Sequence, residues 1–129
     1  MKICLDTNAY SSFKKGNQNI REIMENADEI FVPATVLGEL YSGFQIGNLT
    51  EKNLSELNEF LSKPGVSIIP TNTDIAFRYG FITKDLRKQG TPIPTNDMWI
   101  AAANMDKGSV LLSRDKHFKE IPGLLVLDF

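Results

Sequence analysis

Five short apolar runs, separated by longer polar stretches, constrain the fold of this chain more than any other feature of its sequence. The runs are of strand length and rich in valine, isoleucine and leucine, and they read KICL, EIFVP, VSIIP, SVLLS and LLVLDF. Strands that alternate with helices are typical of a parallel sheet covered on both faces. The pattern therefore predicts an α/β sandwich around a mainly parallel sheet of about five strands.

The stretches between these runs carry helical patterns. Leucines recur at helical spacing in LTEKNLSELNEFLSK, and a second apolar stripe runs through TNTDIAFRYGFITKDLRKQG, which Gly90 is expected to end. Thr35 is predicted to cap the helix of VLGELYSGF, and Thr95 the helix of NDMWIAAANM. We find no repeat or linker, so residues 1–129 are expected to form a single domain.

Composition indicates the cellular location of the protein and whether it crosses a membrane. Cys4 is the only cysteine of the 129 residues, so an intrachain disulfide is excluded and a reducing cytoplasm is favoured. No apolar run reaches the roughly 18 residues that span a bilayer, and the chain begins without the pattern of a signal peptide. We expect a cytoplasmic protein with no membrane segment.

The charge balance excludes a simple basic nucleic-acid-binding protein. Lysine and arginine number 14 against 16 aspartates and glutamates, which leaves a net charge of −2. A polyanionic partner would have to be attracted by local basic patches or by a bound cation. The basic clusters are equally well explained as solvated faces.

Four acidic residues stand out because their neighbours are apolar or because a predicted strand has just ended. They are Asp6 after KICL, Glu39 within VLGELY, Asp97 before MWIAAA, and Asp115 after SVLLSR. The carboxyl ends of parallel strands form the edge where α/β proteins bind ligands. Taken singly, each residue is also explained as a helix cap or a turn residue.

Taken together, four carboxylates at one edge would repel one another strongly unless protons or cations neutralised them. Mg²⁺ or Mn²⁺ is the expected cofactor, because these hard ions prefer oxygen ligands. His117 is the only histidine and Cys4 the only cysteine, so zinc sites rich in either residue are excluded. A catalytic mechanism that uses two imidazoles, one as acid and one as base, is excluded because there is only one histidine.

Four segments together carry a resemblance to a known family. They are DTN at residues 6–8, Glu39 after VPATVLG, PIPTNDMWIAAA from Pro92, and LLSRDKHFKEIPGL from Leu111. In order and spacing they resemble the acidic motifs of PIN-domain ribonucleases, most closely the VapC-type toxins of toxin–antitoxin pairs. The resemblance spans essentially the whole chain. It implies a three-layer α/β/α PIN fold and a metal-dependent endoribonuclease that hydrolyses RNA phosphodiester bonds.

The resemblance also assigns roles to particular residues. Asp6, Glu39, Asp97 and Asp115 match its acidic set, with Asp6 and Asp97 expected as direct metal ligands and the other two binding a second metal or orienting water. Side chains beside these acids are expected to hold them by hydrogen bonds, namely Thr7, Asn8, Asn96 and Ser113. His117 and Trp99 are interpreted mainly as packing or capping residues, although Trp99 would also suit base stacking.

Partners follow from the resemblance alone. It implies an RNA substrate, a small antitoxin protein and a homodimer, while the kind of RNA stays open among transfer, ribosomal and messenger RNA. The main alternative is a PIN-like RNA-binding or interaction module without catalytic turnover. An aspartyl phosphatase would need DxD where this chain has DTN, and a receiver-like module would need an aspartate where SIIPTN stands.

Overall fold

The centre of the protein is a sheet of five parallel strands. The computed structural model describes residues 1–129. The strands are β1 (Lys2–Leu5), β2 (Glu29–Pro33), β3 (Val66–Ile69), β4 (Val110–Leu112) and β5 (Val126–Leu127). Their order is β3-β2-β1-β4-β5, and every neighbouring pair is parallel. Each of the five apolar runs contains one strand, and all the pairings are parallel, so the predicted parallel sheet is confirmed.

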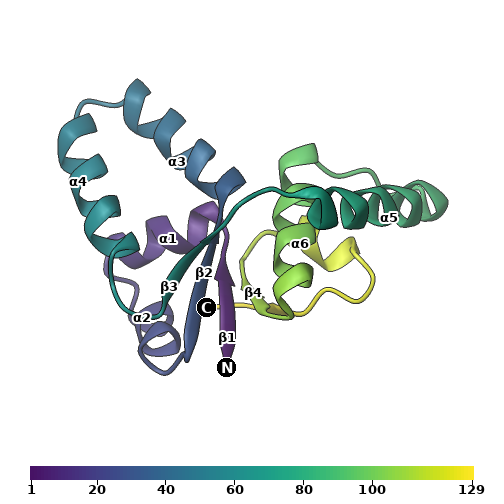
Figure 1. The fold of residues 1–129 in the computed structure, drawn as a ribbon, viewed down its shortest axis with the longest axis horizontal. Coiled ribbons are helices and arrows are strands. Elements are labelled where there is room, and N and C mark those ends of the chain that lie inside the picture. Colours follow the sequence, from purple (N-terminus) through teal and green to yellow (C-terminus); the bar gives the residue numbers. More distant parts are fainter.

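Six α-helices cover the two faces of this sheet. They are α1 (Thr7–Lys14), α2 (Gln18–Glu25), α3 (Ala34–Ile46), α4 (Thr50–Leu61), α5 (Thr73–Gln89) and α6 (Thr95–Lys107), and a 3₁₀ helix, η1 (Lys116–Glu120), follows β4. Figure 1 shows α1 to α4 on one side of the strands and α5 and α6 on the other, which confirms the three-layer arrangement. None of these helices is long and apolar enough to cross a membrane.

The strand order places a natural binding edge between β1 and β4. From β1 the chain adds β2 and β3 on one side, and it then returns to add β4 on the other. In open parallel sheets, ligands bind beyond the carboxyl ends of the strands at the point where the order reverses. Leu5 pairs with Leu112 at the ends of these two strands. Asp6 and Ser113 are therefore the first residues of two adjacent loops.

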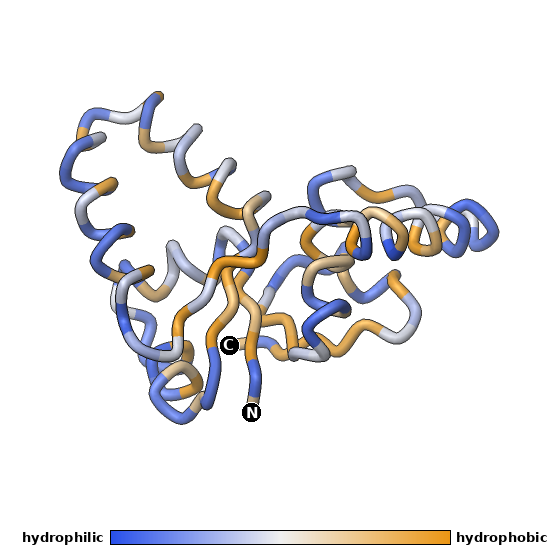
Figure 2. The backbone as a smooth tube through the Cα atoms, viewed as in Figure 1, coloured by the Kyte–Doolittle hydropathy of each residue, from blue (hydrophilic) through white to orange (hydrophobic).

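The core consists mainly of the apolar strand residues and the helix faces that pack on them. Figure 2 shows hydrophobic segments along the central strands and more hydrophilic ones along α4 and the outer turns of α5. Only four polar side chains are buried: Asp6, Asn104, Ser109 and Ser113. Ser109 donates to the Asn104 side chain at 2.6 Å, which joins the end of α6 to β4. The other two belong to the loops beyond β1 and β4.

Some local predictions fail at the helix starts. Thr35 and Thr95 cap nothing, because α3 and α6 begin directly after Pro33 and Pro94, whose extended backbones occupy the cap positions without a side-chain bond. The early helices α1 and α2 were not predicted, since each has only eight residues. Gly90 ends α5 as expected, with a left-handed backbone at φ 73°.

Candidate metal centre

All four predicted carboxylates line one small cavity at the carboxyl edge of the sheet. The cavity has a volume of about 120 Å³, and its wall is formed by Asp6, Thr7, Asn8, Glu39, Asp97, Ile100, Asp115 and Phe118. The four acids come from the end of β1, from α3, from the first turn of α6 and from the loop after β4. The fold therefore brings together residues that lie up to 109 positions apart in the chain.

Asp6 is the deepest of these acids, with only 4% of its surface exposed. Its Oδ1 accepts a hydrogen bond of 2.7 Å from the Ala9 backbone N–H, so it also caps α1. Its Oδ2 accepts a bond of 2.5 Å from the Ser113 hydroxyl, and Ser113 Oγ accepts another of 2.9 Å from the Asp115 N–H. Ser113 thus joins the loop of Asp6 to the loop of Asp115.

Glu39 reaches the cavity from α3. Most of the apolar residues around it are buried, and Glu39 itself is half-buried. Its Oε1 accepts a hydrogen bond of 2.9 Å from the Thr7 hydroxyl at the start of α1. This bond holds the carboxylate toward the segment that carries Asp6. The two predicted neighbours Thr7 and Ser113 therefore each hold one of the acids.

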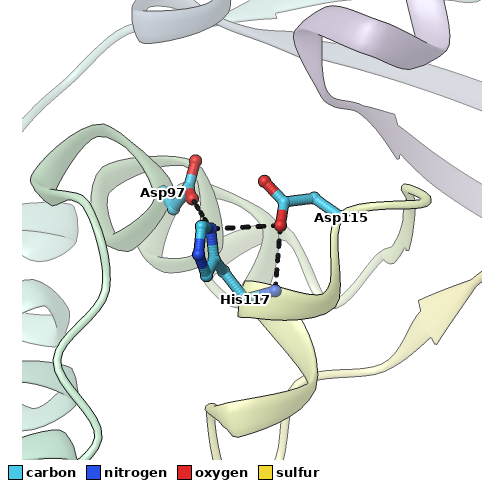
Figure 3. Close-up of side chains that lie close together, drawn as sticks. All are labelled: Asp97, Asp115 and His117. Atoms are coloured by element: carbon cyan, nitrogen blue, oxygen red, sulfur yellow. Dashed lines mark hydrogen bonds and ion pairs between the residues drawn. The ribbon is translucent and has the colours of Figure 1, made fainter.

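The most compact group contains Asp97, Asp115 and His117 (Figure 3). His117 Nδ1 lies 3.2 Å from Asp97 Oδ2 and 3.1 Å from Asp115 Oδ1. Asp115 Oδ1 also accepts a bond of 2.9 Å from the His117 backbone N–H, which starts η1. One possible ligand atom from each residue lies within 4.8 Å of the other two. This spacing is short enough for one cation to contact all three side chains.

Burial and mutual repulsion raise the pKa values of two acids in this site. For Asp6, burial is the main cause, and the charges of Asp115 and Asp97 add to it, whereas the bonds from Ser113 and Ala9 act in the opposite direction. For Asp97, burial again raises the pKa most, followed by the charge of Asp115, while His117 lowers it. Both acids therefore lie where a positive charge would be strongly stabilised.

The remaining predicted neighbours contribute less to the geometry. Asn8 lines the cavity, while Asn96 is exposed and does not. Trp99 stacks on Tyr79 of α5, with ring centroids 4.1 Å apart, so one face of the indole is already covered. His117, interpreted from the sequence mainly as a packing or capping residue, has its side chain between Asp97 and Asp115. Its position as the only histidine, two residues after an acid at a strand end, was the available signal.

The donor set suits a divalent cation. Carboxylate oxygens from four segments surround one cavity, and hard ions such as Mg²⁺ and Mn²⁺ prefer such oxygen ligands. The hydrogen bonds from Ser113 and Thr7 orient two of these carboxylates, as ligands of metal sites commonly require. The geometry can therefore hold at least one ion between α6 and the loop after β4.

Comparison with known proteins agrees with this arrangement. Residues 3–124 match the family described as PIN domain. Ribonuclease VapC2 of Rickettsia felis is 31% identical over 127 residues, which cover 95% of this chain and 93% of the relative. The tRNA(fMet)-specific endonuclease VapC of Salmonella typhimurium is 28% identical over 132 residues, covering 100% and 98%.

A solved structure shows the same fold. VapBC2 from Rickettsia felis, bound to a DNA fragment from its promoter, contains a chain that superposes with a TM-score of 0.88 at 28% identity. The alignment covers 100% of this chain and 99% of that one. Sequence and structure thus agree over nearly the full length, and the protein belongs to the PIN domain family.

Proposed function

We propose that this protein is a metal-dependent endoribonuclease, the toxin of a toxin–antitoxin pair, which hydrolyses RNA phosphodiester bonds with Mg²⁺ or Mn²⁺. The observation that carries the proposal is the cavity that Asp6, Glu39, Asp97 and Asp115 line at the carboxyl edge of the sheet. Relatives that align over nearly the whole chain are named ribonuclease or endonuclease VapC, and they support the same activity here.

The acidic residues would hold the cation and keep it in place. A divalent ion bound there supplies the positive charge that activates a water molecule and offsets the charge developing on the phosphate. The sequence prediction gave Asp6 and Asp97 as the direct ligands. The short spacing of Asp97 and Asp115 favours that pair instead, and Asp6 faces the same cavity from the end of β1. Thr7 and Ser113 keep Glu39 and Asp6 in fixed orientations.

The surroundings of the site suit a phosphate backbone. Lys116 and Lys119 are exposed on η1, directly beside Asp115 and His117. Neither lysine forms an ion pair within the chain, whereas Lys14 pairs with Glu56. Lysines beside a metal site can contact phosphates whatever the base sequence. They would compensate for the net charge of −2, which by itself gives no attraction to RNA.

The substrate and the partner are proposed from the relatives. The Salmonella relative is named as specific for tRNA(fMet), so transfer RNA is the first substrate to test. VapBC2 from Rickettsia felis suggests a small antitoxin as partner, and a neighbouring gene that encodes a short protein would support this. We also propose a homodimer and a cytoplasmic location, both carried over from the sequence prediction.

The direct test is an RNA cleavage assay with the purified protein. A transfer RNA pool that contains tRNA(fMet), ribosomal RNA and a messenger transcript would be incubated with Mg²⁺ or Mn²⁺, and new 5′ ends would be mapped. We expect internal cleavage that excess EDTA abolishes. Cleavage that continues in excess EDTA would overturn the metal-dependent mechanism.

Nearly isosteric variants test which carboxylates matter. Asp6→Asn, Glu39→Gln and Asp97→Asn should each lower the cleavage rate about 100-fold or more, because each removes a charge from the metal site. Glu59→Gln is the matched control, since Glu59 is exposed on α4, away from the cavity. Rates near wild type in all three site variants would show that other residues carry the activity.

A further inference from the structure

His117 occupies an unusual position between two carboxylates from different elements. Asp97 comes from the first turn of α6, whereas Asp115 precedes η1, and the same nitrogen of His117 faces both (Figure 3). The distances from Nδ1 are 3.2 Å to Asp97 Oδ2 and 3.1 Å to Asp115 Oδ1. As a donor, the Nδ1–H would have to be shared between the two oxygens, and the contact with Asp115 is an ion pair only when the ring is protonated.

The same distances fit three ligands of one metal ion. In an octahedral site with metal–ligand bonds of about 2.1 Å, neighbouring ligand atoms lie about 3.0 Å apart. Both Nδ1 distances are close to this value, so His117 is spaced from each carboxylate as neighbouring ligands are. In the neutral tautomer with its hydrogen on Nε2, the Nδ1 lone pair is available to a cation.

Building on the proposed function, we infer that His117 is itself a metal ligand, which binds the cation through Nδ1 beside Asp97 and Asp115. Imidazole nitrogen is a poor ligand for Mg²⁺ and a better one for divalent transition metals. His117 therefore makes the site selective for Mn²⁺ over Mg²⁺. A centre made of carboxylates alone would have a weaker preference for Mn²⁺.

Pulsed electron paramagnetic resonance of bound Mn²⁺ tests the inference directly. Because His117 is the only histidine, any imidazole nitrogen that couples to Mn²⁺ in a tag-free protein must come from this residue. We expect ¹⁴N modulation in wild type, a changed pattern after labelling with ¹⁵N-histidine, and no such modulation in His117→Phe. Bound Mn²⁺ without nitrogen coupling in wild type would overturn the assignment.

Calorimetric titration with each metal alone tests the selectivity. His117→Phe keeps a planar ring but removes the nitrogen ligand, so Mn²⁺ affinity should fall about tenfold or more while Mg²⁺ affinity changes by less than about twofold. His117→Asn offers an oxygen near the place of Nδ1 and should also lose the preference for Mn²⁺. An unchanged ratio of Mn²⁺ to Mg²⁺ affinity in both variants would contradict the inference.

The outcomes separate this inference from the proposed function. RNA cleavage together with Mn²⁺ binding that lacks nitrogen coupling would leave the nuclease standing and overturn the role of His117. Nitrogen coupling without cleavage of any RNA would leave the metal ligand standing and overturn the nuclease. Circular dichroism of His117→Phe checks that the fold is retained, which we expect because the side chain of His117 is 42% exposed.

Discussion

At the scale of single residues, the hydroxyl of Ser113 is the connection on which the site geometry depends. It donates to Asp6 Oδ2 and accepts from the Asp115 N–H, and the side chain is buried. A buried carboxylate that loses such a donor is left partly unsatisfied, which is destabilising and also frees it to rotate. In the proposed metal site, Ser113 would therefore act on a bound cation through Asp6 and Asp115.

The corresponding prediction concerns Ser113→Ala. We expect metal affinity and cleavage rate to fall about 10-fold to 100-fold, as is common when a partner of a metal ligand is removed. Titration calorimetry with Mn²⁺ and a cleavage assay measure the two effects. Ser55→Ala, on the exposed face of α4, is the control and should leave both unchanged. Normal metal affinity in Ser113→Ala would assign Ser113 a purely structural role.

A second residue-scale prediction follows from the raised pKa of Asp97. Burial and the charge of Asp115 raise it above the ordinary value of 3.8. A raised folded-state pKa contributes stability below the unfolded-state value, and this is lost as the pH rises through the folded-state value. In metal-free protein at neutral pH the ionised Asp97 is therefore destabilising. Asp97→Asn should melt at the same or a higher temperature than wild type there.

Melting Asp97→Asn and wild type at several pH values distinguishes the loss of the Asp97 charge from a general effect of the substitution. As the pH falls from 7 toward 3.8, Asp97 of wild type becomes protonated, so the advantage of Asp97→Asn should shrink. Thermal melts in metal-free buffer at several pH values measure the difference. Glu59→Gln should show no comparable trend, because Glu59 is exposed. Strong destabilisation of Asp97→Asn at pH 7 would instead identify Asp97 as a structural helix residue.

At the scale of elements, the end of α5 determines how the chain returns to α6. Gly90 has φ 73°, and its backbone N–H bonds back to the last turn of α5. The segment up to Pro94 then leads directly into α6, whose first turn carries Asp97. α5 and α6 pack side by side, with Tyr79 stacked on Trp99. The position of Asp97 thus depends on a left-handed turn and on a helix pair.

Gly80, within α5, and Gly90, directly after it, give a matched pair for testing this turn. Gly90→Ala should destabilise the protein by about 1–2 kcal/mol, because a Cβ is strained in the left-handed region. Gly80→Ala should stabilise it by about 0.5–1 kcal/mol, because Gly80 is exposed in mid-helix with no atom near its Cβ position. Urea denaturation measures both. Equal effects of the two substitutions would show that the turn does not require glycine.

At the scale of the whole molecule, the proposed metal site would link cation binding to folding. The acids belong to segments that meet only in the folded chain, so a cation binds the folded state in preference to the unfolded one. The metal-free fold must tolerate acids with raised pKa values, and a cation bound in the proposed site would relieve their repulsion. Under the proposed function, stability and metal binding would be coupled through this one cavity.

Metal-dependent melting tests this coupling. At a metal concentration about 100 times the dissociation constant, Mn²⁺ or Mg²⁺ should stabilise wild type by about 2.7 kcal/mol, seen as a higher Tm. Asp97→Asn should gain much less, because it lacks one of the closely spaced ligands. Four thermal melts at pH 7 test whether Asp97 is a ligand: wild type and Asp97→Asn, each in EDTA or in millimolar-range metal. Equal stabilisation of both proteins would exclude Asp97 as a ligand.

The sequence alone determined the parallel sheet, because buried strands between polar helical segments leave few other ways to cover both faces of each strand. It also singled out Asp6, Glu39, Asp97 and Asp115 as candidates, since an acid among apolar residues or at a strand end is conspicuous, and these four line one cavity. Helix starts were less predictable. The extended backbones of Pro33 and Pro94 took the cap positions that Thr35 and Thr95 were expected to fill.

Only the tertiary structure decided which side chains meet. The pairing of Leu5 with Leu112 brings Ser113 to Asp6, which lies 107 positions away in the chain. The packing of α6 beside η1 brings His117 between Asp97 and Asp115. No local pattern encodes such contacts, because their distances depend on strand register and helix packing. Residue types therefore specify which chemistry is available, and the fold specifies where it is assembled.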